Sequence, residues 1–141
     1  MLVTTTTAAI SDLSILSKID SMVIGSENRK PKIEQYILNE QCVVASINRE
    51  PVGYACYDTT FFECCFIQLV IVNPNFRRLG IAGALIRYIE EHSPTPKLFT
   101  STNESNTIMQ QVCLSLGFVR SGIIENLDDG DPEWVYFKQA R

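Results

Sequence analysis

The chain of 141 residues lacks several features that define whole classes of protein. It contains no run of about 18 apolar residues, the length that a helix needs to cross a membrane. Its first residues place no basic segment ahead of an apolar one, so we expect no export signal. Its net charge of −4 leaves no broad basic surface to neutralise nucleic-acid phosphates. These absences predict a soluble protein that binds neither membranes nor nucleic acid.

Cysteine and histidine are too few, or wrongly spaced, for a cross-linked or metal-stabilised fold. The five cysteines form an odd set without a Cys-x-x-Cys pair, which disfavours a disulfide framework and a zinc site. The single histidine, His92, excludes a metal site with two histidine ligands. We therefore predict no metal and a reducing, cytoplasmic location.

The composition and length indicate one globular domain. Hydrophobic residues make up 45% and charged residues 20%, close to the average of globular proteins. A chain of this length can bury one good core, and it is too short for two ordinary domains. We expect residues 1–141 to form a single domain.

The spacing of apolar residues predicts the secondary structure. We expect a strand at 2–9 and then a helix capped by Ser11. The apolar residues of that helix are Ile15, Leu16, Ile19, Met22 and Val23. The later elements are a helix around 27–39, strands at 42–47, 52–58 and 63–72, a helix from Ile81, a strand at 97–102, a helix at 104–117, and strands at 118–127 and 133–138. This order predicts an α/β fold with a mixed, mostly antiparallel central sheet, helices on both faces and one β-α-β crossover. The strand at 63–72 is so apolar that we expect it to be buried on both faces.

The stretch "NPNFRRLGIAGALI" (73–86) has residues that suit a phosphate group. A strand, a short loop and a helix start leave backbone N–H groups free to bind an anion. Gly80 permits a turn and a close approach to a ligand, and Ala82 keeps the next position small. Arg77 and Arg78 can pair with phosphate oxygens. The same residues also suit an ordinary turn with solvent-facing arginines, and the stretch is neither a P-loop nor a dinucleotide fingerprint.

Two motifs in the chain resemble those of the GNAT superfamily of N-acetyltransferases. Residues 66–86 are similar to its acyl-CoA-binding motif, a strand ending in V-x-P that leads into [QR]-x-x-G-x-[GA] and a helix. The matching residues are Val72, Pro74, Arg77, Gly80 and Ala82. Residues 106–118 resemble the family's N-x-x-A-x-x-x-Y-x-x-x-G-F segment through Asn106, Gly117 and Phe118. Two motifs in the family's order are more specific than either alone, and the likeness extends over nearly the whole chain, towards bacterial members without an assigned substrate.

The resemblance implies a GNAT-like acyl-CoA N-acyltransferase fold and a function. Acetyl-CoA would donate its acetyl group to a primary amine of a small molecule or peptide, by direct attack in a ternary complex, and homodimers are common in the family. Backbone groups of Val70 and Val72 would pair with the pantetheine arm, amides of 78–82 would hold the pyrophosphate, and Asn106 would contact the cofactor from the last helix. The implied cofactor-binding residues are Val70, Val72, Arg77, Arg78, Leu79, Gly80, Ile81, Ala82 and Asn106.

The catalytic positions depart from the family pattern. Cys113 stands where relatives usually have a tyrosine that protonates the departing thiolate. A thiol can return a proton, but a free cysteine is commonly a small buried hydrophobe, and water can supply the proton instead. We expect Cys113 to face the cofactor groove, beside a core stripe of Ile108, Met109, Val112 and Leu116.

The general base is also missing from its usual place. Phe66 occupies the position of a carboxylate that many relatives carry on the central strand. Glu63 lies nearby and is a candidate base, although a solvated charge at a strand end explains it more simply. Gln68 cannot take a proton but can order a water. Because the tyrosine and the strand carboxylate are both absent, a CoA-binding regulatory or interaction module is the alternative function.

The segment "ENLDDGDPE" (125–133) concentrates acidic residues before the last strand. Asp-Gly turn chemistry in a polar hairpin explains most of it. As an alternative, Asp128 and Asp129 border the acceptor site and attract a cationic amine, as the corresponding loop does in relatives. Acetylation of charged tRNA, a third possibility, is disfavoured by the acidic net charge.

Overall fold

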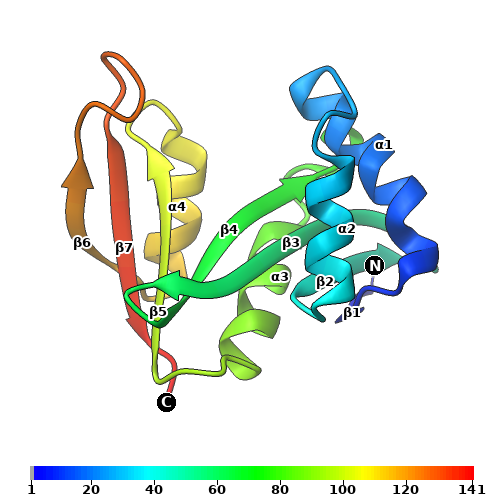
Figure 1. Cartoon of the computed structure of the whole chain (residues 1–141), viewed down its shortest axis with the longest axis horizontal. Coiled ribbons are helices and arrows are strands. Elements are labelled where there is room, and N and C mark those ends of the chain that lie inside the picture. The colour runs from blue at the N-terminus through cyan, green and yellow to red at the C-terminus, as the bar shows by residue number, and fades with distance from the viewer. Residues whose placement is uncertain (1) are drawn as a thin grey trace. The chain divides into compact units, whose positions relative to one another are not determined.

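The computed structural model describes residues 2–141, and its elements follow the predicted order (Figure 1). The strands are β1 (Val3–Thr7), β2 (Cys42–Ile47), β3 (Glu50–Phe61), β4 (Cys64–Val72), β5 (Lys97–Asn103), β6 (Val119–Ile124) and β7 (Glu133–Gln139). The helices are α1 (Leu13–Ile24), α2 (Lys30–Leu38), α3 (Ile81–Glu91) and α4 (Thr107–Ser115), with short 3-10 helices at Ile10–Asp12 and Pro74–Phe76.

The strands form one mixed sheet in the order β1-β2-β3-β4-β5-β7-β6. The pairs β1–β2, β2–β3, β5–β7 and β6–β7 are antiparallel, whereas β4 and β5 are parallel. Parallel neighbours need a crossover connection, which α3 provides. The predicted mixed sheet with one β-α-β crossover is therefore confirmed.

The chain divides into two compact units, and β3 and β4 contribute residues to both. The first unit contains the chain up to Tyr57 together with Leu69–Ile89. The second unit contains Asp58–Gln68 and Glu90–Arg141.

In the first unit, α1 and α2 cover one face of the sheet. Leu16 and Ile19 of α1 and Ile33 of α2 form a buried cluster with Val44 and Tyr54 of the strands. These five side chains are at most 3% exposed. The cluster shows that the apolar spacing predicted for both helices does direct them onto the sheet.

The first helix begins differently from its prediction. A 3-10 turn precedes α1, and the carboxylate of Asp12 accepts the N–H of Ala9 at 2.8 Å. Ser11 lies inside this turn, so the prediction that it caps the helix is wrong. An aspartate three residues after the first free N–H provides the acceptor instead.

The buried face of α1 also differs from its apolar pattern. Met22 and Val23 are 55% and 42% exposed, whereas Asp20 is 1% exposed. The Arg29 guanidinium donates two hydrogen bonds to the Asp20 carboxylate, at 2.7 and 3.1 Å. A charge can occupy the buried face because this bidentate partner satisfies it, which apolar spacing alone does not reveal.

The opposite face of the sheet in the first unit receives the start of α3. A Cβ on Gly53 of β3 would lie 2.9 Å from the carbonyl oxygen of Ile71 and 3.1 Å from Cγ2 of Ile81. Glycine at this position therefore lets the helix begin close to the strands. Gly53 thus positions the loop between β4 and α3, and the prediction of helices on both faces holds in this unit.

Strand β4 is less buried than its apolar sequence predicts. Its buried part is Cys65–Ile67, whereas Gln68 is exposed and residues 69–72 are half-buried. Pairing with β5 covers the same Cys65–Ile67, opposite Leu98–Thr100. The prediction that the whole strand is buried on both faces is wrong, because its buried part coincides with this short ladder.

In the second unit, α4 ends in the way its glycine predicts. Gly117 has a φ of 92°, and the N–H of Phe118 donates to the carbonyl oxygen of Cys113 at 3.0 Å. This pattern is a Schellman motif. The Lys138 ammonium on β7 donates to the carbonyl oxygen of Leu116 at 2.6 Å, which ties the end of α4 to the sheet.

Candidate active site

The loop between β4 and α3 is anchored at its start. Asn73 is 8% exposed, and its N–H donates to the carbonyl oxygen of Val52 at 2.8 Å. Its side-chain oxygen accepts the N–H of Asn75 at 2.9 Å. These bonds tie the start of the loop to β3, and such ordering lowers the entropic cost of binding a ligand.

The end of the same loop has the backbone geometry of an anion site. Gly80 has a φ of 76°, and a Cβ placed on it would meet nothing within 4 Å. The first hydrogen bond of α3 runs from the N–H of Ala84 to the carbonyl oxygen of Gly80 at 3.0 Å. The amides of Ile81, Ala82 and Gly83 therefore precede the hydrogen-bonded part of the helix. Open space beside a left-handed glycine and free amides at a helix start suit a phosphate.

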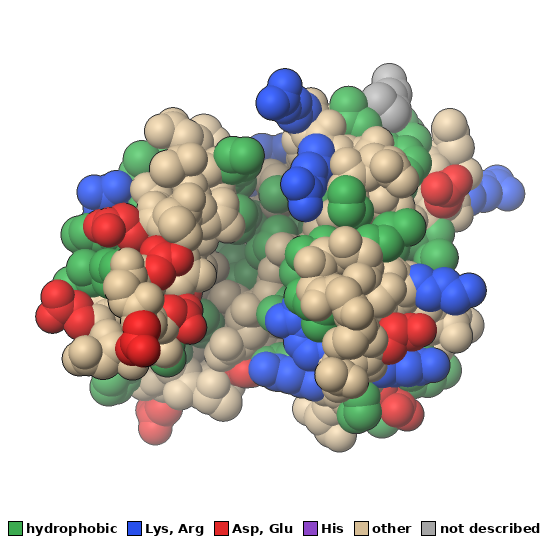
Figure 2. Space-filling model, turned by 90° about the horizontal axis from the view of Figure 1, so that it is seen from above, with side chains coloured by type: hydrophobic (Ala, Val, Ile, Leu, Met, Phe, Trp, Pro, Cys, Tyr) green, Lys and Arg blue, Asp and Glu red, His purple; other side chains and the backbone are tan. Residues whose placement is uncertain are grey.

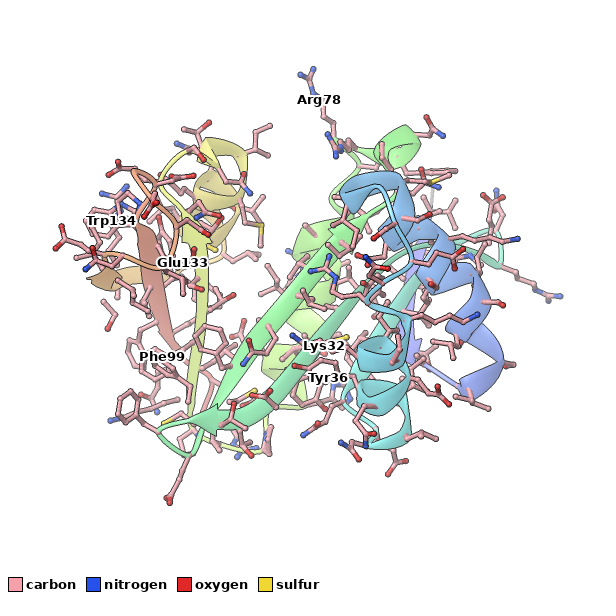
Figure 3. All side chains as sticks on the ribbon, turned by 45° about the horizontal axis from the view of Figure 1, so that its top comes forward. Lys32, Tyr36, Arg78, Phe99, Glu133 and Trp134 are labelled. Atoms are coloured by element: carbon pink, nitrogen blue, oxygen red, sulfur yellow. The ribbon has the colours of Figure 1, made fainter. Side chains whose placement is uncertain are left out.

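Three arginines add positive charge to this part of the first unit. Arg77 and Arg78 are exposed, and Arg78 extends from the loop into solvent (Figure 3). Arg87 of α3 is also exposed, and its guanidinium nitrogens lie 3.5 and 3.8 Å from the Cβ position of Gly83. Residues four apart on a helix are neighbours, so Arg87 reaches back to the first turn. The sequence motif does not include Arg87, although this spacing could have identified it.

The other predicted cofactor residues lie on β4, in the loop and at the start of α4. Val70 and Val72 are half-buried and lie in the part of β4 beyond its pairing with β5. Leu79 is 38% exposed and directly precedes Gly80. Asn106 is the N-cap of α4, where its Oδ1 accepts the N–H of Met109 at 3.1 Å. The structure therefore places Asn106 in the second unit and the other predicted cofactor residues in the first.

Cys113 is fully enclosed by protein. Its exposed fraction is 0%, and burial raises the pKa of its thiol to about 11. The thiol is therefore protonated at neutral pH. Its sulfur has no exposed surface that a reacting group could approach.

The buried side of α4 differs in part from the predicted apolar stripe. Gln110 and Cys113 are the helix's buried residues, whereas Ile108 is 75% exposed. The Gln110 amide donates to the carbonyl oxygens of Asn103 and Glu104, at 3.1 and 2.7 Å. The predicted stripe is therefore wrong at Ile108, whereas Met109, Val112 and Leu116 are half-buried. The bonds of Gln110 draw a polar side chain inward beside them.

Glu63, the candidate base, and Gln68, which can order a water, lie in different surroundings. Glu63 is exposed in the turn between β3 and β4, where Phe62 and Glu63 have φ values of 50° and 63°. The predicted strand at 63–72 begins one residue later, at Cys64. Gln68 instead lines a cavity in the second unit, and its Nε2 donates to Oδ1 of Asp58 at 3.2 Å. The structure does not bring Glu63 to that cavity.

The cavity has a volume of about 340 Å³. Its walls come from the five strands of the second unit and the β6–β7 loop: Thr60, Phe61, Phe66, Gln68, Ser101, Ile124, Leu127 and Glu133. Within this lining, Glu133 is the single charged residue. The Ser101 hydroxyl donates to Oε2 of Glu133 at 2.7 Å. Figure 3 shows Glu133 and Trp134 on opposite sides of β7, as alternation along a strand requires. The volume falls at the small end of the range for ligand pockets.

Two acidic residues of the hairpin, Asp128 and Asp131, have structural partners instead. Asn103 Nδ2 donates to Asp128 Oδ2 at 2.9 Å, and the N–H of Ser105 donates to Asp131 Oδ1 at 3.0 Å. These bonds join the β6–β7 loop to the β5–α4 connection. Figure 2 shows acidic side chains gathered over the end of this unit that carries the loop. Of the acidic residues at 125–133, Glu133 reaches the cavity.

The sequence did not reveal the cavity as a whole. Ser101 and Glu133 are far apart in the chain and meet because Ser101 pairs with Val135, two residues beyond Glu133. Alternation along each strand predicts that Phe66 and Gln68 share a face. Alternation does not determine the register between strands. The sequence therefore did not predict that Ser101 and Glu133 lie together.

Three further features concern membranes, metal ions and disulfides. Among residues 2–141, no helix combines the length and hydropathy needed to span a membrane. The same residues contain no group of three or more His, Cys, Asp or Glu side chains arranged to hold a metal ion. The cysteines Cys42, Cys56, Cys64, Cys65 and Cys113 are all free thiols.

The fold and the β4–α3 loop agree with the known proteins that the chain resembles. The family model for the acetyltransferase (GNAT) family matches residues 13–118. A GNAT-family acetyltransferase from Bacillus cereus is 45% identical with a TM-score of 0.97, over 99% of this chain and 98% of that one. The yncA protein of Salmonella typhimurium, solved with its cofactor acetyl-CoA, is 16% identical with a TM-score of 0.80, over 99% and 94% of the two chains. No curated protein sequence matches the chain.

The match to the family model covers most of the chain, including the β4–α3 loop and the end of α4. The Bacillus cereus structure extends the likeness to nearly every residue of both chains. The left-handed Gly80 and the free amides after it show the loop geometry that the motif implies. The chain therefore belongs to the GNAT family and is an N-acetyltransferase.

Proposed function

We propose that this protein transfers the acetyl group of acetyl-CoA to a primary amine of a small molecule or peptide, by direct attack within a ternary complex. The observation that carries this proposal is the open space beside the left-handed Gly80 at the start of α3. The chain is a member of a family of acetyltransferases, and acetyl-CoA is the bound cofactor of a structure with the same fold. We further propose that residues 1–141 work as one domain in the cytoplasm.

The first unit would bind the nucleotide end of acetyl-CoA. Amides of 78–82 would donate to the pyrophosphate, and Arg77, Arg78 and Arg87 would neutralise its charge. Backbone groups of Val70 and Val72, beyond the β4–β5 ladder, would pair with the pantetheine arm. Asn106 already caps α4 and would contact the cofactor through the rest of its side chain.

Catalysis in this proposal needs no acid from Cys113. Bringing two substrates together and polarising the thioester carbonyl with a backbone N–H supply most of the rate. The enclosed thiol supports the packing role for Cys113, and water would return the proton to the leaving thiolate.

Two glycines test the cofactor site as a matched pair. Gly80 and Gly25 both have positive φ, and a Cβ on either would meet nothing within 4 Å. Gly80→Asp should weaken acetyl-CoA binding about 100-fold, because a carboxylate would crowd and repel the pyrophosphate. Gly25→Asp, at the end of α1, should bind like the wild type. Calorimetry measures both, and equal affinities of the two variants would overturn the site assignment.

A thiol-release assay with acetyl-CoA and a panel of amines tests the reaction itself. We expect release of CoA that depends on the amine. Binding of acetyl-CoA without release from any amine would support the alternative, a CoA-binding module without catalysis.

A further inference from the structure

The cavity of the second unit has walls that are mainly apolar. Phe61 and Phe66 come from neighbouring strands, and their ring centroids lie 4.8 Å apart. Ile124 and Leu127 contribute from β6 and the loop after it. Apolar walls with a few placed polar groups are typical of small-molecule sites. Such a cavity favours an occupant with an apolar body.

A row of aromatic rings fixes the shape of this wall. Phe61 also contacts Phe99 at 5.1 Å, and Phe99 contacts Phe137 at 5.2 Å between centroids. Tilted contacts at these distances are favourable and hold each ring in place. The faces of such rings attract both aromatic groups and cations. The wall therefore suits a flat apolar group attached to a positive charge.

The single carboxylate in the lining sets the charge of the occupant. Glu133 is half-buried, and Ser101 holds its Oε2 at 2.7 Å, which leaves Oε1 for a ligand. No lysine or arginine is among the residues that line the cavity. A substrate carboxylate would meet Glu133 without a compensating cation, whereas an ammonium group would be paired. These surroundings favour an occupant that carries a positive charge and no acid group.

Glu133 can also take the place of the carboxylate that is missing from β4. Phe66, at the position where many relatives carry a base, lines the same cavity as Glu133. The carboxylate therefore enters this cavity from β7, while β4 contributes an aromatic wall. The neighbouring Asp128 and Asp131 are held by Asn103 and Ser105, so the loop that carries Leu127 is braced.

The geometry points to a primary amine with an aromatic or similarly flat apolar body as the acceptor, bound in this cavity, with Glu133 as its ammonium partner and base. This inference rests on the proposed acetyl transfer. The ammonium gives one proton to Glu133, and the nitrogen lone pair then attacks the thioester carbonyl. The N–C bond forms as the C–S bond breaks, the departing thiolate takes the second proton through water, and Glu133 returns the first to solvent.

The test uses three amines that differ in one feature each. Phenethylamine carries the aromatic body and the ammonium, phenylalanine adds a carboxylate, and ethanolamine lacks the apolar body. We expect kcat/KM in the thiol-release assay to be highest for phenethylamine by at least about 10-fold. Equal rates for the three amines, or a preference for phenylalanine or ethanolamine, would overturn the substrate class.

Glu133→Gln tests the role of the carboxylate. Glutamine keeps the shape and can still accept the hydrogen bond from Ser101, but it neither pairs with an ammonium nor takes its proton. We expect kcat/KM for phenethylamine to fall about 100-fold, the scale of general-base catalysis. Glu125→Gln, on the same hairpin but exposed and outside the cavity lining, is the control and should retain activity.

Calorimetry with acetyl-CoA on the same variants separates the two proposals. If Glu133→Gln binds acetyl-CoA like the wild type and loses turnover, both proposals are supported. If it retains full turnover, the role of Glu133 is overturned and the acetyl transfer stands. If the wild type fails to bind acetyl-CoA, the proposed function itself fails.

Discussion

The β4–α3 loop and the cavity of the second unit present different kinds of chemical group to a ligand. The loop offers mainly backbone groups, namely a left-handed glycine and helix-start amides, together with exposed arginines. The cavity offers side chains, drawn from five strands and a loop and held against one another. The loop would recognise a group common to all acyl-CoA molecules, whereas the cavity would recognise one class of acceptor.

The difference teaches where substitutions should matter. Amides and exposed charges act together and over a distance, so the loss of one arginine removes only part of the attraction. A cavity wall acts through contact, so the loss of one ring removes surface that nothing replaces. We therefore expect the loss of one side chain to cost more in the cavity than in the loop.

Phe61→Ala should have the largest of these effects. Removing a ring from the cavity wall loses about 2 kcal/mol of apolar contact, so kcat/KM for phenethylamine should fall about 30-fold. The measurement is the thiol-release assay at limiting amine. Acetyl-CoA affinity, measured by calorimetry, should not change.

Phe62→Ala is the matched control for this change. Phe62 is the next residue and its ring contacts that of Phe61 at 5.0 Å between centroids. It is 86% exposed in the turn and does not line the cavity, so its loss removes no cavity surface. Its loss should leave kcat/KM within about twofold. Equal losses in the two variants, with thermal unfolding unchanged, would contradict the assignment of the cavity as the acceptor site.

The loop was predictable from the sequence because its function depends on local features. Gly80 and the helix start lie within a few residues of each other, and the motif that contains them has fixed spacing. Arg87 lies outside the motif. Its place four residues after Gly83 in the predicted helix could have indicated it, but only the direction of its side chain brings it to the first turn of α3.

The order of elements was also predictable, whereas burial was less so. Apolar spacing gave the correct sequence of strands and helices, since each pattern is set by its own element. Asp20 and Gln110 broke the predicted faces of their helices because partners elsewhere in their units satisfy them. Glu133 lies beside Ser101 because of the register between β5 and β7, which the sequence pattern of neither strand predicts.

Arg87→Ala should have a moderate effect and shows how tolerant the loop is. We expect acetyl-CoA affinity to fall about fivefold at low salt, because one of three nearby positive charges is lost. The difference should shrink as salt is added, since exposed charges are screened. Calorimetry at two salt concentrations measures it.

Lys18→Ala controls for net charge in the same unit. Lys18 is exposed on α1, which packs on the sheet face opposite α3, so its removal should leave acetyl-CoA affinity unchanged. Equal losses from Lys18→Ala and Arg87→Ala would show that only the net charge matters.

Cys113→Ala should have the smallest effect on activity and a clear effect on stability. The enclosed thiol fills space, so its loss should cost about 1 kcal/mol of unfolding free energy at pH 7, with kcat within about twofold. Because burial raises the pKa of this thiol to about 11, the unfolded chain ionises first as the pH rises. The stability that the buried, protonated thiol contributes is therefore fully present below the ordinary thiol pKa and is lost as the pH rises towards 11. Denaturant unfolding should show the wild type losing stability faster than Cys113→Ala over this range, and the advantage of the wild type should shrink. A loss of kcat beyond about 10-fold with unchanged stability would instead assign the thiol a catalytic proton, and the second unit would then contribute acid as well as base.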